Sequence, residues 1–221
     1  MHIVKIVGKP NQSTWSQVHV FKPEDEKLGS HGEIMAALSF KAKSEEVEVS
    51  SFGKEIINRL QEIYYSNASE SILKKIEQTL ESLAAEFLTQ VELEAVIGVI
   101  WSAGKTYLYA GRNGRGQAVL KRGEARVNLF NGNGEGIETV SGEIKPGDRW
   151  LLGTEQLFKI VIEGEIGLIL ASSELEQAGE SLGALVYGQE HNSQVAAVLA
   201  ETEPVEEEQD IIKDTPSLRK G

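Results

Sequence analysis

Residues 141–157 read SGEIKPGDRWLLGTEQL. Within them, Pro146-Gly147-Asp148 is typical of a tight turn, in which Asp148 is predicted to hydrogen-bond its own backbone. The apolar residues 149–153 that follow are typical of a buried strand. This segment therefore predicts a turn leading into the core, and the sequence on either side extends the pattern.

Short apolar segments separated by turn residues lie on both sides of this turn. The glycine-rich segments 111–116 and 131–136 predict loops, and the polar segment 23–32 predicts a hairpin loop. Trp15, Trp101 and Trp150 fall in apolar segments, and we expect all three in the core. The predicted strands are 15–21, 33–40, 93–101, 106–110, 118–120, 125–130, 149–153 and 194–200.

Three segments have apolar residues spaced three and four apart, as expected for helices with one buried face. They are 52–65, 69–89 and 173–187. Ser50 or Ser51 is expected to cap the first, and Ser173 with Glu176 forms a capping-box pattern for the last. Separate runs of strands and helices predict an α+β fold: two antiparallel sheets, with the first two helices on one outer face and the last on the other.

Composition excludes several classes of function. The 221 residues carry a net charge of −12, which disfavours a nucleic-acid binder. There is no cysteine, so disulfides, thiolate metal sites and a cysteine nucleophile are excluded. No apolar run approaches the roughly 18 residues of a membrane helix. We expect a cytoplasmic protein that does not insert into a membrane.

Much of the negative charge is concentrated near the end of the chain. Residues 201–214 contain seven acidic residues and one lysine. Such a segment buries too little apolar surface to offset its ordering entropy. We therefore divide the chain into a domain over 1–200 and a disordered acidic tail or linker over 201–221.

The segment 141–157 resembles the PPM family, the metal-dependent (type 2C) protein phosphatases. That family has S-G-x-L-x-P-G-D, an apolar strand and then T-D-G-L, where this chain has Thr154-Glu155-Gln156-Leu157. Residues 114–120 resemble the family's G-D-S-R-A-Y-L segment, and 122–124 its R-x-G turn. His191-Asn192 takes the place of a D-N pair. The resemblance spans about residues 13–200.

This resemblance implies a β-sandwich of two antiparallel sheets flanked by helical layers. It also implies a binuclear Mg²⁺ or Mn²⁺ centre at one end of the sandwich, held by carboxylates. A metal-bridging water there attacks phosphoserine or phosphothreonine, because two cations lower the pKa of the water and hold the phosphoryl oxygens.

The carboxylates that the resemblance requires are mostly replaced. The D-G position falls within 39–41, which reads Ser-Phe-Lys and has no carboxylate. Glu155 stands in place of the aspartate of T-D-G, His191 in place of that of D-N, and Arg115 in place of that of G-D-S. Glu24 and Asp25 follow the first predicted strand; we expect them to solvate the hairpin, with a position near a metal as the alternative.

Three hypotheses follow. The first is a PPM-fold pseudophosphatase without a metal cofactor, acting as a binding or regulatory module for a protein partner. The second is an atypical metal-dependent Ser/Thr phosphatase, with Glu155 and His191 as ligands of Mn²⁺ or Mg²⁺. The third is a structural domain of a longer, membrane-tethered protein. A local anion site at Arg112 and Arg115 is the alternative to a simple turn over 111–116.

Overall fold

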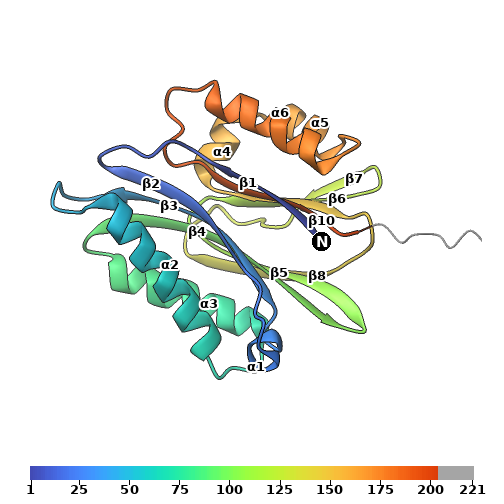
Figure 1. Cartoon of the computed structure of the whole chain (residues 1–221), viewed down its shortest axis with the longest axis horizontal. Helices are drawn as coiled ribbons and strands as arrows, with labels where there is room; N and C mark the ends of the chain where they lie inside the picture. Colours follow the sequence, from blue (N-terminus) through green and yellow to red (C-terminus); the bar gives the residue numbers. More distant parts are fainter. Residues whose placement is uncertain (204–221) are drawn as a thin grey trace, which may run out of the picture.

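The computed structural model describes residues 1–203, which form two five-stranded antiparallel sheets packed face to face (Figure 1). Sheet A has the strand order β1-β10-β9-β6-β7, and sheet B the order β2-β3-β4-β5-β8. The elements are β1 (His2–Val7), β2 (Thr14–Phe21), α1 (Glu26–Gly29), β3 (Glu33–Ala42), α2 (Val49–Ser66), α3 (Ile72–Phe87), β4 (Val91–Ala103), β5 (Lys105–Asn113), β6 (Gln117–Arg122), β7 (Ala125–Asn128), β8 (Ile137–Ile144), β9 (Arg149–Gly153), α4 (Glu155–Ile160), α5 (Glu163–Leu170), α6 (Leu175–Tyr187) and β10 (Ala196–Glu201).

Helices cover the outer face of each sheet (Figure 1). The α2–α3 pair packs on sheet B, and α4, α5 and α6 pack on sheet A. The predicted α+β sandwich, with the first two helices on one face and the last helix on the other, is confirmed.

Three apolar layers hold the sandwich together, and two of them contain or border the predicted core tryptophans. Trp15 packs between sheet B and its helices, where its ring stacks on Phe40. Trp150 is fully buried between the sheets. Trp101 is half-buried at the margin of the first layer. The third layer lies between sheet A and its helices.

Several elements differ from the sequence-based expectation. No strand is predicted at β1 or β8, and no helix between Thr154 and Ser173, where α4 and α5 lie. The cap of α2 is Glu48, whose carboxylate accepts from the amides of Ser50 and Ser51, so the prediction of a serine cap is wrong. The capping box predicted for Ser173 and Glu176 is also wrong, because α6 begins at Leu175 after Glu174, without a side-chain cap.

The C-terminal strand β10 runs through Glu201, and Thr202 Oγ1 donates to the carbonyl of Lys145. The predicted tail beyond Glu203 lies outside the described residues. Within 1–203, no helix is long and apolar enough to cross a membrane.

Candidate functional site

The family's metal position falls at the end of the sandwich where β3 leaves sheet B and β9 leaves sheet A. In sheet B, the register aligns Ser16 on β2 with Ser39 on β3, and Ser39 with Glu94 on β4. Residues opposite one another on adjacent strands share a face, so these three side chains form one polar row facing sheet A. Phe40 faces the other way, into the core beneath α2. Within the D-G position 39–41, Ser39 and Lys41 therefore share the face towards the site, with Ser39 buried and Lys41 exposed.

Glu94 is the carboxylate at the centre of this row, and the sequence reading did not single it out. Its Oε2 accepts from Ser39 Oγ at 3.2 Å, and its Oε1 accepts from the amide of Glu155 at 2.9 Å. Burial raises the pKa of Glu94, although these donors and the amide of Gly116 favour its ionised form. Glu94 thus links β4 of sheet B directly to the first residue of α4, just beyond sheet A.

The Glu155 carboxylate lies among cations. Its Oε1 is 2.9 Å from Lys159 Nζ, one turn later in α4, and 3.9 Å from Arg115 Nη1. Arg115 stands where the family has an aspartate. A positive charge, which repels a metal cation, therefore replaces a negative charge that would attract it. The negative charge of Glu155 is already shared with two side chains of the protein.

His191 and Asn192 have separate roles. The His191 side chain is exposed, and its backbone carbonyl accepts from Gln156 Nε2 at 3.1 Å. Asn192 is buried; its Nδ2 donates to the carbonyls of Val186 and Gln189, and its Oδ1 accepts from the amide of Lys9. The D-N position therefore retains a residue that fastens the end of α6 to the segment after β1.

The residues present do not fit a binuclear divalent centre. Mg²⁺ and Mn²⁺ prefer several carboxylate oxygens, whereas the polar row offers two hydroxyls and one carboxylate. Among residues 1–203, no three His, Asp or Glu side chains lie close enough together to hold a metal ion. Ser16 Oγ is buried without a hydrogen-bond partner, but a single hydroxyl does not replace a bridging carboxylate.

The structure also locates the other candidate residues. Arg112 is buried, and its guanidinium donates to the carbonyls of Gly116 and Gly132 and to Glu138, so it is not available to a bound anion. The predicted loop over 111–116 is correct only for 114–116, where Gly114 has φ +99°, because residues 111–113 belong to β5. Asp25 caps α1 by accepting from the amide of Lys27. Asp148 accepts from the amide of Lys145 within its turn, as predicted, and also pairs with Arg122.

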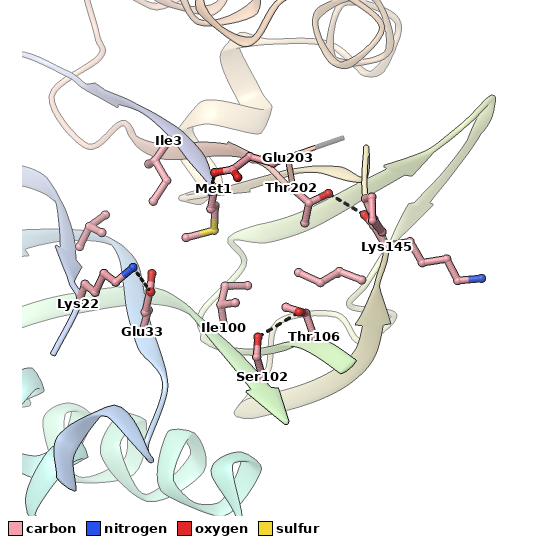
Figure 2. Close-up of a pocket in the computed structure, with 13 residues that line it drawn as sticks. Met1, Ile3, Lys22, Glu33, Ile100, Ser102, Thr106, Lys145, Thr202 and Glu203 are labelled. Carbon is pink, nitrogen blue, oxygen red and sulfur yellow. Dashed lines mark hydrogen bonds and ion pairs between the residues drawn. The ribbon is translucent and has the colours of Figure 1, made fainter. Parts of the chain in front are cut away.

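A cleft of about 520 Å³ lies at the opposite end of the sandwich (Figure 2). Isoleucines from both sheets line it, together with the Lys22–Glu33 ion pair and the hydroxyls of Ser102 and Thr106. None of the residues aligned with the family's metal ligands lies in this cleft.

Solved structures identify the fold. No protein-family model and no curated protein matches the chain. The catalytic domain of the serine threonine protein phosphatase PstP, in complex with two manganese ions, is 16% identical, with a TM-score of 0.63, over 90% of this chain and 96% of that one. PppA, a key regulatory component of T6SS in Pseudomonas aeruginosa, is 12% identical (TM-score 0.55), over 91% and 98%. The phosphatase domain of the cell fate determinant SpoIIE from Bacillus subtilis is 12% identical (TM-score 0.55), over 99% and 94%.

The chain therefore has the PP2C (PPM) phosphatase fold, which confirms at the level of fold the resemblance found in residues 141–157. At these identities the likeness extends to the fold alone, and the activity must be argued from the residues at the site.

Proposed function

We propose that this PPM-fold domain does not hydrolyse phosphoesters and acts as a binding or regulatory module for a protein partner. The observation that carries the proposal is the side-chain set at the metal end: Ser39 at the D-G position, Glu94 bound to the amide of Glu155, and Glu155 paired with Lys159. The predicted cytoplasmic location is part of the proposal, and cell fractionation tests it.

Electrostatics supports the absence of hydrolysis. Two divalent cations held about 3.5–4 Å apart repel each other strongly and need several carboxylates around them. Here Glu94 already accepts a hydrogen bond from the amide of Glu155, and the Glu155 carboxylate already forms an ion pair with Lys159. Arg115 adds a positive charge beside Glu155. A regulatory role agrees with PppA, which is described as a regulatory component.

The atypical phosphatase remains the second candidate, because Glu94 places an additional carboxylate beside Glu155. In that case Glu155 and His191, helped by Glu94, would have to move closer together to hold Mn²⁺, because no three such side chains are close enough among residues 1–203. The two candidates differ in a directly measurable activity.

We expect no Mn²⁺- or Mg²⁺-dependent hydrolysis of para-nitrophenyl phosphate or phosphopeptides above the level of a Glu155→Ala variant. Steady-state assays with and without metal, on both proteins, measure this. Glu163→Ala, an exposed acidic residue of α5, is the matched control for loss of one negative charge. Metal-dependent turnover that Glu155→Ala abolishes and Glu163→Ala retains would establish the atypical enzyme instead.

A further inference from the structure

Lys75 is a buried cation far from the metal end of the sandwich. It lies on the face of α3 that packs against sheet B, and only 6% of it is exposed. No carboxylate whose position the structure describes forms an ion pair with it. Its Nζ instead lies 3.0 Å from Nδ1 of His31, in the connection between β2 and β3.

The segment 28–32 around His31 is fastened to α2 as well as α3. The Tyr64 hydroxyl donates to the His31 carbonyl at 2.7 Å, and the Tyr65 hydroxyl donates to the Gly32 carbonyl at 2.9 Å. The imidazole of His31 stacks on the Tyr65 ring, with centroids 5.9 Å apart. Gly32 has φ +86°, and a Cβ there would lie 2.7 Å from the carbonyl oxygen of Ile100, so the backbone has little room to adjust.

The contact between Lys75 and His31 works in one protonation state only. A lysine ammonium has donors and no acceptor, so Nδ1 of His31 must be unprotonated to accept from it, and the ring proton must be on Nε2. When the imidazole gains a second proton, both nitrogens become donors. Nδ1–H would then face the ammonium, and two positive charges would lie about 3 Å apart, where they repel.

We propose that His31 and Lys75 form a pH-sensitive latch, which holds segment 28–32 on α3 while the imidazole is neutral and releases it when the imidazole is protonated. Among the side chains that the structure describes, the titratable groups beside the latch are Tyr64 and Tyr65 of α2, with Tyr109 of β5 next to Tyr64. The nearest carboxylate along the chain, Glu33, is 2.9 Å from Lys22 Nζ and is thus already paired. Residues 99 and 100 of β4, which pack against Gly32, are apolar.

The direction of the pH dependence follows from the pKa shifts of His31 and Lys75. Burial, reinforced by the charge of Lys75, lowers the pKa of His31, and burial lowers the pKa of Lys75. A histidine whose folded-state pKa lies below its unfolded value of about 6.5 favours folding above that pH, and this contribution is lost as the pH falls below it. The latch is therefore closed at neutral pH and opens in acid.

Opening of the latch would affect the cleft at this end of the sandwich. The segment that the latch holds runs between Lys22 and Glu33, which line that cleft (Figure 2). Protonation of one imidazole would thus loosen a wall of the cleft, on the opposite side of the domain from the metal end.

NMR titration of the imidazole rings tests the latch. His31 should titrate below the ordinary histidine value in the unmodified protein, and its pKa should rise towards that value in Lys75→Met, which keeps the apolar stem and removes the charge. His31→Gln assigns the resonance. The matched control is His19, half-buried and bonded to Gln61, whose pKa should not change in Lys75→Met.

Two further readouts need no substitution of Lys75. Ring nitrogen shifts at pH 7.5 should show the tautomer protonated on Nε2. Hydrogen exchange of residues 28–32, corrected for intrinsic rates, should increase about tenfold between pH 7.5 and 5.5 and be unchanged in His31→Gln. A His31 pKa identical with and without Lys75, a ring protonated on Nδ1, or pH-independent exchange would overturn the proposal.

Discussion

Replacing Arg112 with methionine should lower the free energy of unfolding by about 3 kcal/mol, because it removes a buried cation that binds one carboxylate and two backbone carbonyls. The guanidinium is 1% exposed and lies over the Phe130 ring at 4.8 Å. It donates to the carbonyls of Gly116 and Gly132 and to Glu138, at 2.7–2.9 Å. Methionine fills part of the space but leaves the two carbonyls without this donor, and leaves Glu138 with only the amides of Asn131 and Gly132.

Urea unfolding followed by tryptophan fluorescence measures this loss. Arg59→Met is the matched control, since Arg59 makes ion pairs with Glu62 and Glu86 on the solvent side of α2 and α3. Exposed pairs contribute little, so the control should lose much less stability than Arg112→Met. Equal small losses in the two variants would show that Arg112 does not organise the β5–β6 connection and the 130–138 loop.

Gly53→Ala should destabilise the protein by about 1–3 kcal/mol, the usual cost of overpacking a core. Gly53 lies on the buried face of α2, and a Cβ there would be 2.2 Å from Cε2 of Trp15. The Trp15 ring cannot retreat, because it stacks on Phe40 at 5.2 Å. Alanine must therefore push α2 away from sheet B, even though it is a better helix former than glycine.

Gly164→Ala is the control for this substitution. Gly164 lies in α5 and would have no atom within 4 Å of an added Cβ. There the helix propensity of alanine should dominate and raise stability by up to about 1 kcal/mol. Thermal unfolding of the two variants should thus shift in opposite directions. If both gain stability, the close approach of α2 to Trp15 is wrong.

The parts of the fold that the sequence predicted are those with a strong local pattern. Residues 141–157 combine a turn with a buried strand, and α2, α3 and α6 each have an apolar stripe. The apolar residues of α5 do not lie on one face: Leu168 is exposed, as is Ile162 just before the helix. Its sequence therefore lacks the spacing of apolar residues that predicts a helix with one buried face. In β8, Glu138 pairs with Arg112 and Glu143 pairs with Lys105, both on β5. These two charged residues interrupt the alternation of apolar and polar residues by which a strand is recognised.

The candidate site was predictable only where the family resemblance marked a position. Glu155, His191 and Ser39 were found in this way. Glu94 was missed, because its role depends on the β3–β4 register and on contact with a residue 61 positions away. The only local sign of its role in the sequence is that Glu94 directly precedes the apolar, β-branched segment of β4. The His31–Lys75 contact spans 44 positions and left no comparable local pattern.

Calorimetric titration with Mn²⁺ tests most directly the proposal that this PPM-fold domain holds no binuclear metal centre. The unmodified chain should give no saturable binding heat in the range where the combined variant Ser39→Asp, Glu155→Asp and His191→Asp does, because that variant places an aspartate at three of the four positions where the family has one. Ser39 is chosen over Phe40 because its side chain faces the site. Saturable binding of two Mn²⁺ ions per unmodified chain would contradict the account.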